Sequence, residues 1–239
     1  GTSGLDLTYS GGFTLNQTGP ASGVSSVLLN GSSGRIDSGS TIDLYHASFS
    51  VEAWFKTTSA ADNTIIRLFG GAVDRYFLYV DANGRVLANL VGNYTGISRT
   101  ADGVAPNGVW THVVGSFDAG TGRNTIYING QNATVTQTAN STGHASTAIT
   151  FIVGNGAGLF FAGNIGPVAY YSDALTAQQA SDLYDASTAS TVQSSAYQFL
   201  NANTSRWANL GTGSSTYTLA SSGLGSGSKL NVKHRDARI

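Results

Sequence analysis

The alternation of apolar and polar residues is clearest in one segment of the chain. In residues 49–56 (FSVEAWFK) the odd-numbered positions are apolar and would share one face, whereas Ser, Glu, Trp and Lys alternate on the other. A period of two is typical of a β-strand with one face against a dry core. We therefore expect a sheet strand over residues 49–56.

Several other short strands are expected, separated by turn signals. The turns are Asn30-Gly31, residues 81–84 (DANG) and Asn129-Gly130, and the last two are of the Asx-Gly type that closes hairpins. The expected strands cover residues 25–29, 64–69, 76–81, 85–91, 110–118, 124–128, 133–136, 149–153 and 159–171. This number of short strands at this spacing predicts an all-β protein, an antiparallel two-sheet sandwich of the jelly-roll kind.

One segment departs from the strand pattern. In residues 175–185 (LTAQQASDLYD), Thr176 is placed to cap a helix and Gln179, three residues later, completes a capping box. Ala180, Leu183 and Tyr184 would give this helix one apolar face. We expect a short helix directly after the last strand, packed on the end of the sandwich.

The chain divides into a sandwich and a shorter C-terminal segment. We assign residues 1–186 to the sandwich, residues 187–195 to a Ser/Thr/Ala linker and residues 196–239 to a short β segment with a basic tail. Residues 211–223 echo residues 1–12, because both run from Gly-Thr through small residues to Tyr and then to Ser and Gly. The C-terminal segment is therefore expected to be a truncated repeat or a swapped strand, which completes this module or a neighbour.

Composition narrows the classes of function. The chain has 12 Lys and Arg, 13 Asp and Glu, and 10% charged residues, against about 25% in an average soluble domain. Because it lacks a basic face, nucleic acid is not an expected partner, and the basic residues of the tail are expected to be solvated. No apolar run reaches the ~20 residues of a membrane span.

The chain begins with Gly rather than Met, so we expect Gly1 to be an internal boundary of a longer polypeptide.

A set of motifs resembles the laminin-G-like branch of the concanavalin A-like lectin/glucanase superfamily, of the kind found in bacterial surface and phage virion proteins. The motifs match in order and spacing over residues 9–186. They are residues 9–15 (YSGGFTL), 27–36 (VLLNGSSGRI), 49–56, 110–118 (WTHVVGSFD), 126–130 (IYING) and 163–176 (GNIGPVAYYSDALT). The resemblance implies a two-sheet antiparallel jelly roll of about a dozen strands. Relatives often carry an acidic pair in the strand before the helix, where this chain has Gly166-Pro167-Val168.

Glycoside hydrolysis is the first activity that the resemblance raises. Retaining glycosidases need two carboxylates about 5 Å apart, and the glucanase branch places them in a Glu-x-Asp-x-(x)-Glu pattern. Glu52 is the only glutamate of this chain, so the pattern is absent. We expect no catalytic residue and no enzyme activity, with a hydrolase built from distant aspartates as a minor alternative.

Glu52, Trp54 and His112 form the one constellation that could carry chemistry. The first two share a strand face, and a neighbouring strand would bring His112 beside them. The arrangement fits a polar ligand site or a packed, hydrogen-bonded layer on the sheet. We favour the layer, because these positions belong to the motifs of the fold itself.

Candidate ligand residues come from aromatic and loop positions. Sugar binding uses aromatic platforms beside polar side chains, and the candidates are Tyr76, Tyr79, Asn89, Asn93 and Tyr94. Laminin-G-like relatives often hold calcium with loop oxygens, which this ion prefers. The resemblance therefore implies calcium as an optional cofactor, and no cofactor as a required one. The candidate calcium ligands are Asp62, Asn63, Asp74, Asp102 and Asp118.

Two functions remain open at this point. The first is a non-catalytic structural or adhesion module of a larger extracellular or virion surface assembly, such as a phage tail, fibre or capsid decoration, that recognises host-surface glycans. Its partners would be other subunits of that assembly, as oligomers or tandem modules. The second is a soluble secreted carbohydrate-binding module. Both place the chain outside the cell or on a virion surface.

Overall fold

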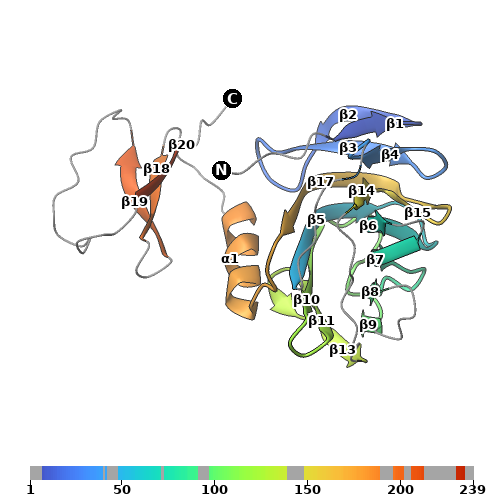
Figure 1. Cartoon of the computed structure of the whole chain (residues 1–239). Coiled ribbons are helices and arrows are strands. Elements are labelled where there is room, and N and C mark those ends of the chain that lie inside the picture. Colours follow the sequence, from blue (N-terminus) through green and yellow to red (C-terminus); the bar gives the residue numbers. More distant parts are fainter. Residues whose placement is uncertain are drawn as a thin grey trace. The chain divides into compact units, whose positions relative to one another are not determined.

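The computed structural model describes residues 7–39, 41, 48–70, 73–90, 97–138 and 148–188, together with the backbone of three strands between residues 196 and 234. The chain forms two compact units, Gly1–Thr188 and Ala189–Ile239. The first unit is a sandwich of two antiparallel sheets followed by one helix (Figure 1). The predicted all-β, two-sheet fold is therefore confirmed.

In the described residues, one sheet has eight strands and the other has seven. The eight-stranded sheet runs in the order β1 (Thr8–Ser10), β4 (Arg35–Asp37), β14 (Thr150–Val153), β6 (Asn63–Gly70), β7 (Val73–Val80), β8 (Val86–Leu90), β9 (Ile97–Thr100), β13 (Thr134–Gln137). The seven-stranded sheet runs in the order β12 (Gln131–Asn132), β11 (Arg123–Ile128), β10 (Thr111–Asp118), β5 (Phe49–Thr57), β17 (Ala162–Tyr171), β3 (Ser25–Asn30), β2 (Phe13–Thr18). A small hairpin of β15 (Asn155–Gly156) and β16 (Leu159–Phe160) lies against β6.

Strand β5 shows how the sequence pattern builds the core. Phe49, Val51, Ala53 and Phe55 are completely buried between the sheets, as the alternation predicts. On the opposite face Trp54 is also buried, which agrees with the packed layer expected there. The helix keeps this face dry, because it covers that face of β5.

The helix α1 covers Ala177–Thr188 and begins as predicted. The backbone N–H of Thr176 donates to Gln179 Oε1 at 2.9 Å, and the N–H of Gln179 donates to Thr176 Oγ1 at 3.3 Å, which confirms the capping box. The helix ends later than expected, two residues into the segment predicted as a linker. Its last turn is held by the hydroxyls of Ser187 and Thr188, which both donate to the carbonyl of Tyr184.

Sequence patterns found most of the long strands, but they missed the six-residue strand β2 and several of the short strands. The strands β1, β4 and β9 have three or four residues each, too few for an alternation to be recognised. The single strand predicted over residues 159–171 is divided into β16 and β17. Within β17 the pairing with β5 shifts between Ile165 and Val168, so Pro167, which has no N–H to donate, lies at a β-bulge.

The second unit contains three antiparallel strands in the order β19 (Arg206–Thr212), β18 (Ala196–Asn201), β20 (Leu230–His234). Strand β18 pairs with both β19 and β20, and all three strands lie within residues 196–239, for which the sequence predicts a short β segment. Most of the segment that echoes residues 1–12 lies outside the described residues. No helix in the described part of the chain is long and apolar enough to cross a membrane.

Candidate functional site on the outer face of the eight-stranded sheet

The outer face of the seven-stranded sheet is covered by α1. Trp54 of β5 stacks on Tyr184 of the helix, with ring centroids 5.8 Å apart, and its Nε1 donates to Ser187 Oγ at 3.2 Å. His112 of β10 is completely buried beside them, 5.1 Å from the Trp54 ring and 5.8 Å from the Tyr184 ring. These three rings dock the helix on the sheet.

Glu52 joins the same layer. Its Oε1 lies 2.9 Å from His112 Nε2, and its Oε2 accepts a hydrogen bond from the hydroxyl of Tyr171. Burial and the neighbouring Glu52 charge together raise the pKa of Tyr171. The predicted Trp/His/Glu layer is thus confirmed, and both oxygens of the only glutamate are engaged within the protein.

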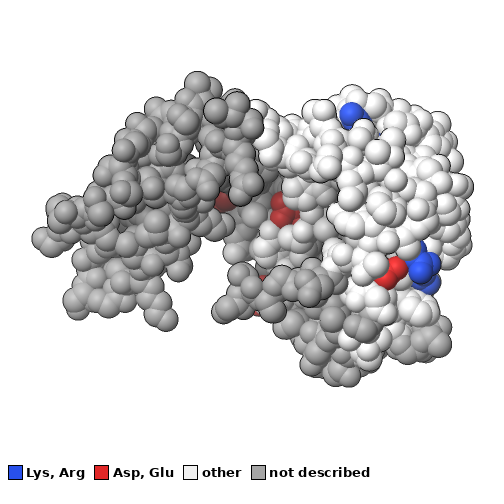
Figure 2. Space-filling model, turned by 90° about the horizontal axis from the view of Figure 1, so that it is seen from above, with Lys and Arg blue, Asp and Glu red and all other residues white. Residues whose placement is uncertain are grey.

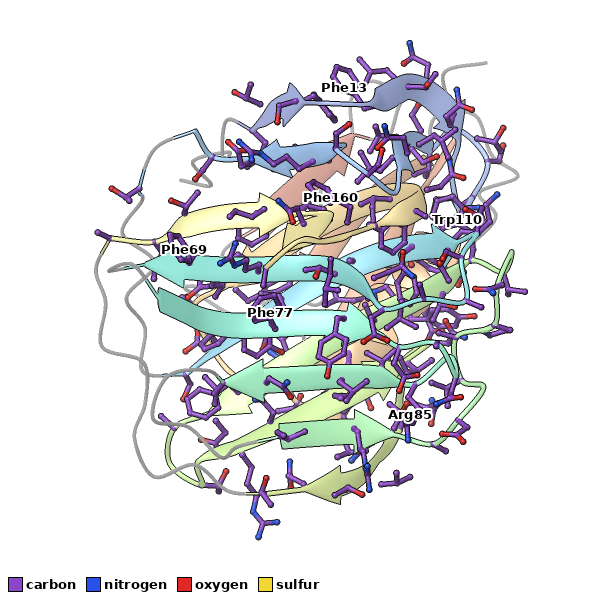
Figure 3. All side chains as sticks on the ribbon, turned by 90° about the vertical axis from the view of Figure 1, so that its right-hand side faces the viewer. Phe13, Phe69, Phe77, Arg85, Trp110 and Phe160 are labelled. Atoms are coloured by element: carbon purple, nitrogen blue, oxygen red, sulfur yellow. The ribbon has the colours of Figure 1, made fainter. Side chains whose placement is uncertain are left out.

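The outer face of the eight-stranded sheet is different, because the only helix among the described residues lies on the other sheet (Figure 1). Strand register places one row of side chains across its middle, and directly paired residues point to the same side. The row runs Ile152, Arg67, Phe77, Asn89, Ile97 across β14, β6, β7, β8 and β9. Figure 3 looks onto this face and shows Phe69 and Phe77 on neighbouring strands.

We name the central part of this surface the aromatic face and define it by Arg67, Phe69, Phe77, Tyr79 and Asn89. The guanidinium carbon of Arg67 lies 4.4 Å from the ring centroid of Phe69 and 5.5 Å from that of Phe77. Cation–π contact of this kind holds a flexible side chain in place on a sheet surface. The result is a cluster of two phenyl rings with the Arg67 guanidinium over both of them.

The hairpin of β15 and β16 borders the aromatic face. A Cβ atom added at Gly156 would lie only 2.0 Å from Phe77 Cε1, so only glycine allows the backbone to approach the ring this closely. Phe77 is 9% exposed as a result. The hairpin therefore forms a backbone wall at one side of the aromatic face.

Polar groups lie beside the rings. The Asn89 side chain interacts with the Tyr79 hydroxyl; burial raises the pKa of Tyr79, and Asn89 partly offsets that rise. Among the described residues, neither Asn89 Oδ1 nor the hydroxyl of Thr64, which pairs with Tyr79 across β6 and β7, has a hydrogen-bond partner. Both atoms are buried, so they are unsatisfied polar groups beneath the aromatic face and are not exposed to a ligand on it.

A charged cluster lies at the turn between β7 and β8. Arg85 Nε donates to Asp81 Oδ2 at 2.6 Å and lies 3.4 Å from Asp102 Oδ1. Burial alone would raise the pKa of Asp81, but hydrogen bonds from the Arg85 side chain and from the backbone of Arg85 and Asn83 lower it overall. The carboxylate of Asp81 is thus occupied in fixing the turn.

The structure brings together two of the five predicted ligand residues. Tyr79 and Asn89 are neighbours on the aromatic face. Tyr76 was placed wrongly, because it is completely buried in the core, where its ring meets Phe49 edge-on at 5.1 Å and cannot stack on a sugar. Asn93 and Tyr94 lie outside the described residues.

Sequence reasoning missed Arg67, Phe69 and Phe77. The sequence does indicate that Phe77 accompanies Tyr79, since the two are two residues apart and must share a face of one strand. Arg67 and Phe69 repeat that spacing on β6.

The predicted calcium ligands have separate structural roles. Asn63 is buried, and its Oδ1 accepts a hydrogen bond from the backbone of Ala162 at 2.8 Å. Asp118 accepts from Gly120 N and from Thr121 Oγ1 within its own turn. Asp62 Oδ1 accepts a hydrogen bond from Ala82 N at 3.3 Å, and Asp102 Oδ1 lies 3.4 Å from Arg85 Nε. The side chain of Asp74 lies outside the described residues. Within the described ranges no three His, Asp or Glu side chains gather to hold a metal ion, so calcium binding stays a prediction.

The motifs and the two-sheet sandwich can now be compared with known proteins. Residues 30–181 match the family described as the concanavalin A-like lectin/glucanases superfamily, Laminin_G_3. The chain belongs to this superfamily. No curated protein matches it in sequence.

Solved structures share the fold at low sequence identity. Domain 4 of AbnA, an extracellular arabinanase from Geobacillus stearothermophilus solved with arabinotriose, is 23% identical with a TM-score of 0.51, and the match covers 75% of this chain and 87% of that one. The CBM40 of Ruminococcus gnavus IT-sialidase, bound to α2,3-sialyllactose, is 14% identical with a TM-score of 0.54, over 66% and 96% of the two chains. A heptameric SAP-like pentraxin from Limulus polyphemus is 17% identical with a TM-score of 0.57, over 69% and 83%.

Proposed function

We propose that this superfamily member is a non-catalytic glycan-binding module that serves adhesion within a larger extracellular or virion surface assembly. The observation that carries the proposal is the aromatic face, in which Phe69 and Phe77 lie under the Arg67 guanidinium on the sheet surface that the helix leaves uncovered. Ligand sites combine an apolar aromatic surface with a few placed polar groups. Tyr79 and Asn89 supply such groups directly beside the rings.

Two of the similar structures support a glycan as the ligand. The CBM40 and the arabinanase domain were solved with sialyllactose and arabinotriose, and both share the sandwich fold. The alternative of a soluble secreted carbohydrate-binding module uses the same site and differs only in what the chain is attached to.

The position of Glu52 supports a role without catalysis. A glycosidase acid or nucleophile must reach the sugar, and its partner carboxylate lies about 5 Å away in retaining enzymes. Glu52 lies instead in the layer beneath α1, hydrogen-bonded to His112 and Tyr171. We infer that it stabilises the docked helix.

The test is a glycan array followed by titration calorimetry of the full chain with a soluble, monovalent form of the glycan that binds. Tyr79→Ala and Asn89→Ala each remove a group from the aromatic face, and we expect at least tenfold weaker binding, about 1.4 kcal/mol. Val109→Ala is the control, because Val109 is 50% exposed and lies outside the aromatic face. Its affinity should equal that of the parent chain.

Circular dichroism and the urea midpoint would verify that each variant is folded. The proposal fails if no glycan on the array binds. It fails equally if both aromatic-face variants bind at the parent affinity, or if Val109→Ala weakens binding as much as they do.

A further inference from the structure

Both sheets end on the same side of the sandwich. Strand β2 is the last strand of the seven-stranded sheet and β1 is the last strand of the eight-stranded sheet (Figure 1). Within the described part of the chain, no strand pairs with the outer edge of either one. We name this side, formed by β1 and β2, the open edge.

The open edge exposes large apolar side chains. Tyr9, Phe13 and Leu15 are 41%, 38% and 44% exposed. The rings of Tyr9 and Phe13 lie 5.3 Å apart although they come from different sheets. Tyr9 pairs with Ile36 and Phe13 pairs with Leu29, both buried core residues, so the two rings point toward the interior of the sandwich. The open edge is therefore the uncovered end of the core.

A groove of about 410 Å³ lies beside these side chains. Its walls include Tyr9, Leu15, Val27, Ile36, Ile165 and Pro167. Projecting apolar groups thus lie directly beside a groove whose lining is mixed, because Asn16, Ser25 and Ser26 join the apolar side chains there. A surface that carries both can fit a copy of itself across a twofold axis, because each copy supplies the projection that fills the hollow of the other.

Charge also favours a second copy as the occupant. Residues 7–34 contain no charged side chain, and Arg35, the next residue, is paired with Asp37 at 2.8 Å. Identical surfaces that meet around a twofold axis bring like charges together, so an uncharged surface avoids this repulsion. Figure 2 looks down on the open edge, and charged side chains appear only as isolated spots on the described surface.

The opposite side of the sandwich shows how an edge is kept from associating. There β12 has only two residues, β13 contains a bulge, and Arg99 and Arg123 are exposed nearby. Short strands, bulges and charged side chains are the usual protection of sheet edges. The open edge has a bulge in β2 as well, but no charged residue.

We propose that the open edge binds the open edge of a second copy of this chain, forming a twofold dimer through Tyr9, Phe13, Leu15 and the neighbouring groove. The dimer carries two aromatic faces. When one aromatic face of the dimer has bound a surface with repeated glycans, binding of the second face is intramolecular. The apparent affinity of the dimer for that surface is therefore higher than that of a single chain.

The test measures mass by sedimentation and light scattering of the full chain across a range of concentrations. The parent chain should approach twice its mass of 24.6 kDa. Leu15→Lys and Phe13→Lys should raise the dimer dissociation constant at least 100-fold. Val135→Lys is the matched control, because Val135 is 63% exposed on the last strand at the opposite side, and it should leave the dimer intact.

A second experiment separates a lost contact from a misfolded chain. The circular dichroism spectra of Leu15→Lys and Phe13→Lys should match that of the parent chain, because both side chains are exposed and each substitution removes only the contact between copies. A parent chain that stays monomeric throughout overturns the proposal. So does a dimer that survives both lysine substitutions, or one that Val135→Lys disrupts equally. Mass needs no glycan, so its outcome is independent of the proposed binding function.

Discussion

Removal of the His112 side chain tests whether the Trp/His/Glu layer is structural. His112→Ala deletes a buried hydrogen bond to a carboxylate, worth about 2 kcal/mol. It also deletes ring contacts with Trp54 and Tyr184, worth about 1 kcal/mol each. Together these losses predict that the free energy of unfolding falls by about 4 kcal/mol, without allowance for any rearrangement around the resulting cavity.

The measurement is urea unfolding followed by circular dichroism, with Glu52→Ala and the double variant completing a thermodynamic cycle. Because the two residues contact each other, the double variant should lose less than the sum of the single losses, by about 1–3 kcal/mol. Val109→Ala, an exposed position three residues before His112, is the control and should stay within about 0.5 kcal/mol of the parent chain. Loss of glycan binding in His112→Ala at an unchanged urea midpoint would refute the structural role.

Two further substitutions test the core and the turn. Among the described residues the hydroxyl of Tyr76 is buried and has no hydrogen-bond partner, and it would lie 2.2 Å from a Cβ added at Gly115. Tyr76→Phe should therefore raise the unfolding free energy by about 1–2 kcal/mol and reduce the destabilisation caused by Gly115→Ala. Urea midpoints of the single and double variants measure both effects, and strictly additive effects would contradict the proposed contact. Hydrogen bonds lower the pKa of Asp81 below its ordinary value, so its stabilising contribution is present above about pH 4 and is lost as the pH falls through the folded-state pKa. Asp81→Asn should therefore lose less unfolding free energy than the parent chain as the pH falls into the acid range. An equal loss in both chains would show that other carboxylates cause it.

The sequence predicted those features that depend on local periodicity and capping. The alternation in β5 and the Thr176–Gln179 capping box needed only neighbouring residues, and both are as expected. Burial of Trp54 could not be predicted from its strand, because it depends on a helix more than 120 residues away in the sequence.

The candidate site was only partly predictable for the same reason. Tyr76 and Tyr79 are an odd number of residues apart on one strand, so they point to opposite faces, and only Tyr79 reaches the surface. The position of Arg67 over Phe69 and Phe77 depends on the register of β6 against β7, which includes two bulges. Strand register across a sheet is a tertiary property that periodicity along one strand does not encode.

The most direct test of glycan binding at the aromatic face is a methyl NMR titration of the full chain with the glycan identified on the array. We predict that the methyl signals of Ile152, Leu87 and Ile97, which lie on the outer face of the eight-stranded sheet, shift as the glycan is added. The signals of Val114 and Leu175, which pack under α1, should stay unchanged. Shifts confined to Val114 and Leu175, or to the open edge, would contradict the assignment of the binding site.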